Sequence, residues 1–178
     1  KLVNWDTVLK TAISDLEVDQ REVNSKLYYI NYPIERSNDF ITIATTRPET
    51  MLGDTAIAVN PKDKRYMKLI GTNAILPLVG RKLKIIGDDY ADPKQGTGAV
   101  KITPAHDFND YDVGARHKLE LLNIFTDDGK INKNVPDEYV GLDRFEARKK
   151  ILINLKNKNL LAKEENIKNK VPYGDRSN

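Results

Sequence analysis

The sequence contains no cysteine, and no apolar run in it is long enough to cross a bilayer as a helix. Without cysteine there are no disulfides, no thiolate zinc sites and no cysteine nucleophile, so any catalysis must use oxygen or nitrogen groups. Residues 1–6 lack the apolar core of a signal peptide. We therefore expect a soluble cytoplasmic protein that has no membrane partner.

A strong excess of either charge is also missing, since 29 lysines and arginines face 26 acidic residues. This balance does not identify a nucleic-acid binder, although it allows a local basic face. The length of 178 residues suits one domain with its own hydrophobic core. Because the first residue is not methionine and residues 171–178 contain no terminating element, we expect a fragment of a longer chain.

Short runs rich in β-branched and aromatic residues, bounded by turn residues, predict strands. They lie at residues 26–30, 40–44, 55–59, 74–76, 82–86 and 99–102. Asn60 and Pro61 favour the start of a short helix that runs to about Ile70. Asp128 and Gly129 predict a tight hairpin turn between residues 123–126 and 130–131. The pattern indicates an α+β fold with a barrel-like β-sheet core and peripheral helices.

Two helices are predicted in the second half of the chain. One begins at Asp107 and includes Gly114, which weakens a helix. The other covers residues 144–159, with Asp143 as its cap, and its expected buried stripe is Phe145, Ile151, Leu152 and Leu155. Its other face is basic, with Arg144, Arg148, Lys149, Lys150, Lys156 and Lys158. Such a face is usually only solvated, and we favour that interpretation over a phosphate-binding one.

The first segment with chemical interest is the loop at residues 44–54, which follows a predicted strand. It holds hydroxyls, a guanidinium and a carboxylate: Thr45, Thr46, Thr50, Arg47 and Glu49. The guanidinium can fork onto a phosphate or a carboxylate, and the hydroxyls can surround a sugar or a water. The alternative is a turn in which the hydroxyls bond backbone groups and Arg47 pairs with Glu49.

The second segment, residues 96–110, surrounds the last predicted strand. Gly96, Thr97 and Gly98 permit close approach of a ligand, but the third glycine of a dinucleotide-binding fingerprint is missing. Lys101 and Thr103, two residues apart on a strand, point to the same face of the sheet. They are therefore candidates to line one pocket, while the alternative for Lys101 is an ordinary surface lysine.

Asp107 and Asp110 lie three residues apart at the predicted helix start, so both carboxylates can face one pocket. Together they can bind an ammonium and a hydroxyl, whereas the simpler role for Asp107 is a helix cap. His106 has no serine or cysteine partner in a nucleophile motif and is a candidate for binding or structural hydrogen bonding. With Asp112, these residues match no standard zinc or calcium spacing, so we expect no metal.

These two segments, continued by residues 111–117, resemble the editing insertion of the class I aminoacyl-tRNA synthetases for valine, isoleucine and leucine. Residues 4–6, 11–18, 76–81 and 141–150 support the resemblance, which covers nearly the whole chain. The proline–tryptophan pair of isoleucyl relatives is absent, and Glu-Thr-Met-Leu-Gly replaces the usual leucyl Asp-Thr-Leu-Phe-Gly. The valyl family is therefore the best match. Where relatives can carry an aromatic residue before Gly96, this chain has Gln95, so stacking on the terminal adenine is not expected from that position.

The resemblance implies an editing domain over residues 1–178, in which residues 1–20 and 165–178 connect to a missing catalytic core. Its implied reaction is the deacylation of threonine wrongly attached to valine tRNA, because a hydrophobic activation pocket separates threonine from valine only weakly. Asp110 would hold the substrate ammonium and Asp107 the threonine hydroxyl or the attacking water. The other implied site residues are Arg47, Thr50, Lys101 and Thr103.

The implied partners are the 3′-terminal aminoacylated adenosine of tRNA and the remainder of the parent synthetase. No cofactor is expected for the domain, and ATP would be used by the absent catalytic core, whose signature motifs the sequence lacks. Three alternatives stay open: an isoleucyl or leucyl editing domain, a non-catalytic tRNA-binding module, and a metal-dependent hydrolase.

Overall fold

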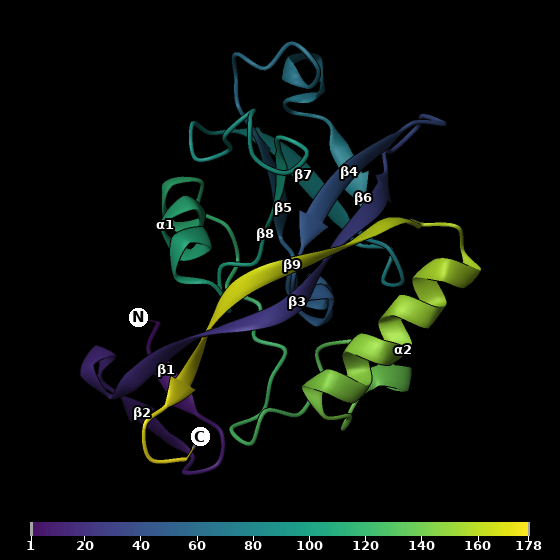
Figure 1. The fold of residues 1–178 in the computed structure, drawn as a ribbon. Helices are drawn as coiled ribbons and strands as arrows, with labels where there is room; N and C mark the ends of the chain where they lie inside the picture. Colours follow the sequence, from purple (N-terminus) through teal and green to yellow (C-terminus); the bar gives the residue numbers. More distant parts are fainter. Residues whose placement is uncertain (1, 178) are drawn as a thin grey trace.

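Two open sheets and a small hairpin make up the β structure of this computed structural model, which describes residues 2–177 (Figure 1). The first sheet has the order β4-β3-β9, with β3 at Val18–Pro33, β4 at Phe40–Thr45 and β9 at Leu161–Gly174. The second has the order β6-β7-β5-β8, formed by Asn73–Ile75, Lys82–Gly87, Ala56–Val59 and Ala99–Ile102. The hairpin joins β1 (Asn4–Asp6) to β2 (Thr11–Ile13).

The predicted α+β class is confirmed. An antiparallel bridge between Ile34 and Ala74 connects the two sheets. The sheet core does not close into a barrel within residues 2–177, because each sheet keeps its own edge strands.

Burial follows the position of each strand. All four residues of β5 are buried, since β7 runs parallel on one side of it and β8 antiparallel on the other. In β3, the alternate residues Tyr28, Ile30 and Tyr32 are buried, while their neighbours are only partly covered. All six predicted strands are present, five of them within one residue of the expected bounds, whereas the one predicted at residues 26–30 is the much longer β3.

The two helices flank the sheets on different sides (Figure 1). Helix α1 (Phe108–Arg116) follows β8 after a short turn, and Asp107 caps its first turn. Helix α2 (Arg144–Asn157) packs against the 3₁₀ helix η2 (Pro48–Gly53). Its buried stripe is Ala147, Ile151 and Leu155, at a spacing of four residues. The expected place of Phe145 in this stripe is wrong, since its side chain is 52% exposed.

Two other predictions, a helix after Asn60 and a hairpin turn at Asp128 and Gly129, have different outcomes. The helix predicted from Pro61 to Ile70 is wrong, because only the short 3₁₀ helix η3 (Met67–Leu69) forms there. The carboxamide of Asn60 accepts from the Lys62 N–H, which closes a local turn that competes with a helix. The hairpin turn is confirmed by the Phe125–Ile131 bridge and the positive φ of 77° at Gly129.

The sequence did not predict β9, which pairs with β3 from Val18–Gly174 to Ile30–Leu161 and forms a long ribbon (Figure 1). Its side chains are mostly polar and exposed or partly exposed, so apolar alternation is weak. The role of residues 165–178 as a connecting segment stays a prediction. None of the helices within residues 2–177 combines the length and apolarity that a bilayer crossing requires.

We predict that Gly114→Ala destabilises the protein. A Cβ at Gly114 would lie 2.8 Å from Cβ of Pro104 and 2.9 Å from its Cγ, and this rigid ring cannot turn aside. This overpacking should cost about 1–3 kcal/mol of stability. That cost exceeds the stabilisation of about 1 kcal/mol that alanine brings over glycine inside a helix. Denaturant unfolding measures the change, and Asp112→Ala on the exposed side of α1 is the control. A stabilised Gly114→Ala variant would contradict the close packing of α1 on Pro104.

Candidate functional site

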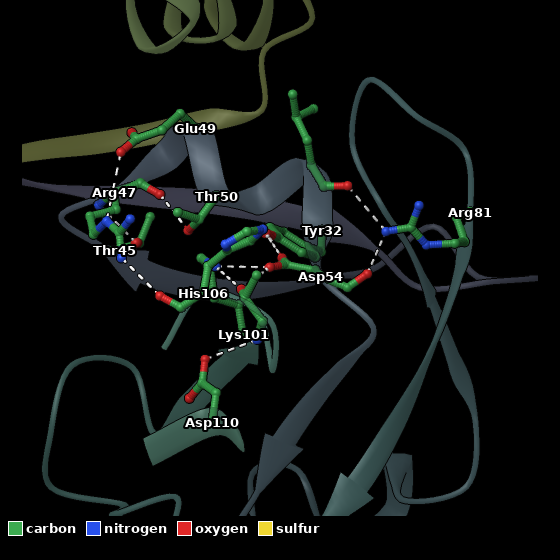
Figure 2. A network of polar contacts seen from close by, with 12 residues as sticks. Tyr32, Thr45, Arg47, Glu49, Thr50, Asp54, Arg81, Lys101, His106 and Asp110 are labelled. Carbon is green, nitrogen blue, oxygen red and sulfur yellow. Dashed lines mark hydrogen bonds and ion pairs between the residues drawn. The ribbon is translucent and has the colours of Figure 1, made fainter. Parts of the chain in front are cut away.

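The two segments singled out in the sequence meet in the structure, as Figure 2 shows. Loop 44–54 leaves β4 and forms η2, and the segment at residues 96–110 enters as β8 and leaves as α1. Arg47 joins them, because its Nη1 donates to the backbone oxygen of His106 at 3.1 Å.

The centre of this region is the fully buried carboxylate of Asp54. Its Oδ1 accepts hydrogen bonds from Lys101 Nζ at 2.8 Å and from Thr103 Oγ1 at 2.6 Å. Its Oδ2 accepts from the Tyr32 hydroxyl at 2.6 Å. Lys101 also donates to the Thr103 hydroxyl. Burial raises the pKa of Asp54, and the Lys101 ammonium opposes that rise.

Lys101 and Thr103 therefore share a face, as predicted, but both face Asp54. Two of the three ammonium donors of Lys101 are used in this network, and any role of Lys101 toward a ligand stays a prediction. Asp54 was not among the candidate residues. A carboxylate two residues before the wholly apolar run 56–59 is a candidate for burial, and a buried carboxylate needs a cation, so this was the signal that could have revealed it.

Asp110 lies on the inner side of α1 and is 6% exposed. Its Oδ2 accepts from the Thr103 N–H at 2.9 Å, and its Oδ1 accepts from the Tyr90 hydroxyl at 3.1 Å. Burial, and then the nearby Asp107 carboxylate, raise the pKa of Asp110 to about 6. The result is a carboxyl group held in a fixed orientation, with lone pairs left for a further donor.

Asp107 sits next to Asp110 and is exposed. Its Oδ1 accepts from the backbone N–H groups of Asn109 at 2.8 Å and of Asp110 at 3.1 Å, so the helix-cap role is confirmed. Among the described residues, none donates to Oδ2 of Asp107. The acid pair therefore combines one buried carboxyl group and one with an oxygen open to solvent or ligand.

His106 has its ring tied into the fold. Its Nε2 accepts from the Ile124 N–H at 3.0 Å, and its ring meets Phe125 edge to face at 4.7 Å. Burial, with the cations Arg47 and Lys101 nearby, lowers the pKa of His106 to about 4. The imidazole is therefore neutral at pH 7 and acts as an acceptor toward the backbone.

Several hydroxyls of the two segments satisfy turns. Thr45 accepts from the Arg47 N–H at 3.0 Å, and the Thr50 hydroxyl donates to the Arg47 carbonyl at 2.9 Å. The Thr97 hydroxyl donates to the Thr42 carbonyl. These contacts agree with the turn alternative, and any role of these hydroxyls toward a ligand stays a prediction.

The glycine pair has a structural reason. Gly96 and Gly98 have positive φ angles of 55° and 83°. A Cβ at Gly98 would lie 2.5 Å from Nη2 of Arg65, which closes over this turn. Their expected approach to a ligand stays a prediction.

A cavity of about 830 Å³ adjoins the acid pair. From the predicted site, its lining includes Thr46, Arg47, His106 and Asp107. Asp110, Lys101, Thr103 and Thr50 lie behind this surface and are buried, each exposed by less than 9%. Residues 2–177 contain no cluster of three or more histidine or acidic side chains that could hold a metal ion.

Glu49 and Arg148 form a second ion pair that the sequence did not predict. Nε of Arg148 lies 2.7 Å from Oε2 of Glu49, and its Nη2 lies 2.9 Å from Oε1. Glu49 is 1% exposed, and its distance to Arg47 is longer, at 3.8 Å. The pair fixes the N-terminal half of α2 to η2, and Arg47 keeps most of its donors free of Glu49.

Comparison with known proteins shows the family of this chain. The chain is 75% identical, over 178 residues, to the valine–tRNA ligase of Pelagibacter ubique, and 56% identical over 177 residues to that of Francisella tularensis. These matches cover 100% and 99% of this chain. The chain belongs to the valyl-tRNA synthetase family. It spans about a fifth of the length of these relatives, 20% and 19% respectively.

A solved structure shares the fold of this chain. It is the ternary complex of LeuRS from Agrobacterium radiobacter K84 with tRNA and LeuAMS, with a TM-score of 0.59 and 20% identity. The match covers 87% of this chain and 21% of that one. The scan against family models found no match.

For this valyl-tRNA synthetase segment, we predict that Asp54→Asn is strongly destabilising. The substitution leaves the buried Lys101 ammonium without its carboxylate, and breaking a buried ion pair costs about 3–5 kcal/mol. Tyr32→Phe is the matched control, since it removes only one hydrogen bond to Asp54, worth about 1 kcal/mol. Denaturant unfolding compares the two. Equal losses for both variants would show that the ion pair is not what holds the site together.

Proposed function

We propose that this chain is an editing domain that hydrolyses the ester between threonine and the 3′-terminal adenosine of valine tRNA. The observation that carries the proposal is the acid pair, in which Asp110 is buried and oriented while Asp107 opens onto the cavity. An aminoacyl ester brings an ammonium and, for threonine, a hydroxyl, and both are donors that carboxylates bind.

In this scheme, the ammonium of the threonyl group reaches the Asp110 carboxyl group behind the cavity lining, and this contact fixes the ester against the inner wall of the cavity. The open oxygen of Asp107 orients a water and accepts a proton as the water oxygen attacks the ester carbonyl. The bond between the carbonyl carbon and the ribose oxygen then breaks, and the leaving oxygen takes up the proton that Asp107 accepted from the water, which restores the carboxylate. The products are threonine and a tRNA with a free terminal hydroxyl, so no covalent enzyme intermediate is needed.

Selectivity against valine follows from the same polar groups. Valine has a methyl group where threonine has its hydroxyl. Bound valine would therefore leave an acceptor of the acid pair, or one next to Lys101 and Thr103, without a hydrogen-bond donor. Each buried group left unpaired costs about 1–3 kcal/mol, which gives a discrimination of about 5- to 150-fold per group.

The comparisons support this proposal at a coarser level. The relatives are named valine–tRNA ligases, and the neighbour of similar fold is a complex that contains tRNA. On that basis, we propose that tRNA and the remainder of a valine–tRNA ligase are the partners of this chain, and that ATP is used elsewhere in that ligase. The relatives favour valine over the isoleucyl and leucyl alternatives.

A deacylation assay with two substrates separates the proposed function from its alternatives. We expect hydrolysis of threonyl-tRNA, much slower hydrolysis of valyl-tRNA, and no effect of a chelator. Asp110→Ala should lower the rate on threonyl-tRNA at least about a hundredfold because the ammonium loses its partner, and a circular dichroism spectrum checks that the fold is kept. Salt-sensitive tRNA binding without hydrolysis would indicate a binding module, and loss of activity with chelator would indicate a metal-dependent hydrolase.

The pH dependence of deacylation is a further prediction. Asp110 binds an ammonium only as a carboxylate, and its raised pKa of about 6 means that it becomes protonated below that pH. The value of kcat/KM on threonyl-tRNA should therefore fall about tenfold per pH unit below pH 6 and level off above it. Rates are measured from pH 4.5 to 7.5 with spontaneous ester hydrolysis subtracted. A profile that is flat down to pH 4.5 would rule out Asp110 as the ammonium ligand.

A further inference from the structure

Arg144, the first residue of α2, lines the same cavity as Asp107 and is half-buried. Among the described residues, none forms an ion pair with Arg144 or accepts a hydrogen bond from its guanidinium, which only stacks on an aromatic ring. A guanidinium carries five donors, and a partly desolvated one normally finds acceptors. Its donors are thus available to a ligand in the cavity.

Arg144 belongs to a group of three arginines on one side of the cavity, together with Arg47 and Arg148. Glu49 compensates Arg148 through two short contacts, whereas its distance to Arg47 is 3.8 Å. Arg47 therefore donates one hydrogen bond, to the His106 carbonyl, and its other guanidinium N–H groups stay available. The carboxylates near these three guanidinium groups are Glu49 and Asp107, the latter through its attraction to Arg47. The group therefore keeps a net positive charge, which favours an anion.

Phe145 explains how these arginines are held. The guanidinium carbon of Arg144 lies 5.0 Å from the Phe145 ring centroid, and that of Arg148 lies 5.4 Å from it. Such stacking reduces the freedom of a long side chain without using any of its N–H donors. It also gives a role to an aromatic side chain that is half-exposed at the edge of the cavity.

The remaining acidic side chains that line the cavity are Asp107 and Asp127. Asp107 caps α1 and lies close enough to Arg47 for their charges to attract, whereas Arg144 comes from the start of α2. The cavity therefore has an acidic part formed by the start of α1 and a basic part formed by the start of α2 and Arg47. A ligand that fits both parts carries a cationic group and an anionic group a short distance apart.

We propose that Arg144 and Arg47 bind the phosphodiester on the 5′ side of the terminal adenosine of the RNA substrate. This inference rests on the proposed function and deepens it. A 3′-aminoacylated adenosine carries an ammonium on its ester side, and its one anionic group is the phosphodiester on the other side of the nucleoside. With the ammonium on Asp110, the phosphodiester faces the arginines, which match phosphate oxygens in a forked geometry.

The test compares two non-hydrolysable analogues on the full-length valine–tRNA ligase that contains this chain. One is 3′-deoxy-3′-threonylamino-adenosine, which has no phosphate, and the other carries the same group at the end of a cytidylyl-adenosine dinucleotide. We expect the dinucleotide to bind about tenfold or more tightly than the nucleoside, as a charge-assisted contact implies. Arg144→Gln should reduce this preference about tenfold and leave the affinity for the nucleoside within about twofold.

Lys149→Gln is the matched control, because Lys149 is an exposed cation on the same helix that does not line the cavity. It should keep the full preference for the dinucleotide. A dinucleotide with an uncharged methylphosphonate linkage should lose the preference in the unaltered enzyme and show no further loss with Arg144→Gln. An unchanged preference in Arg144→Gln, or an equal loss for both analogues, would overturn the proposal. Because the readout is binding, an enzyme that binds both analogues but does not deacylate threonyl-tRNA would refute the proposed function and not this inference.

Discussion

The buried ion pair between Asp54 and Lys101 is the interaction on which the site depends. It joins the end of η2 to the centre of β8, 47 positions apart in the chain, inside a region from which solvent is excluded. The Tyr32 and Thr103 hydroxyls complete the carboxylate's hydrogen bonds, so the pair is both charged and fully satisfied. Thr103 connects this ion pair to the acid pair, because its backbone N–H orients Asp110.

Much of the fold could be predicted because its strands are short, apolar and bounded by turns. The long ribbon could not, since Lys163, Glu165 and Asn169 interrupt the apolar face of β9 and its pairing with β3 joins residues up to 156 positions apart. The helix expected after Pro61 failed because side-chain turns at Asn60 and Asp63 satisfy the backbone locally. Phe145 was misplaced because the register of α2 is set by its packing on η2 and not by apolar residues alone.

In the candidate site, too, features set by neighbouring residues could be predicted from the sequence, whereas contacts between distant residues could not. The proximity of Asp107 and Asp110 follows from helix spacing and was visible in the sequence, as was the shared face of Lys101 and Thr103. Which partner each side chain finds was not visible, because Asp54 and Arg148 come from distant parts of the chain. The division of the cavity into an acidic and a basic part likewise depends on the starts of α1 and α2 lining one cavity, which no local pattern encodes.

The central claim is that the acid pair receives the ammonium of a threonyl ester at this cavity. A crystal structure of the chain, or of its parent ligase, with a non-hydrolysable threonyl-adenosine analogue tests it most directly. The account predicts the analogue's ammonium nitrogen within about 3 Å of an Asp110 carboxylate oxygen, at hydrogen-bond distance, with its side-chain hydroxyl also bonded within the site. An analogue bound with its ammonium away from both Asp107 and Asp110 would contradict the claim.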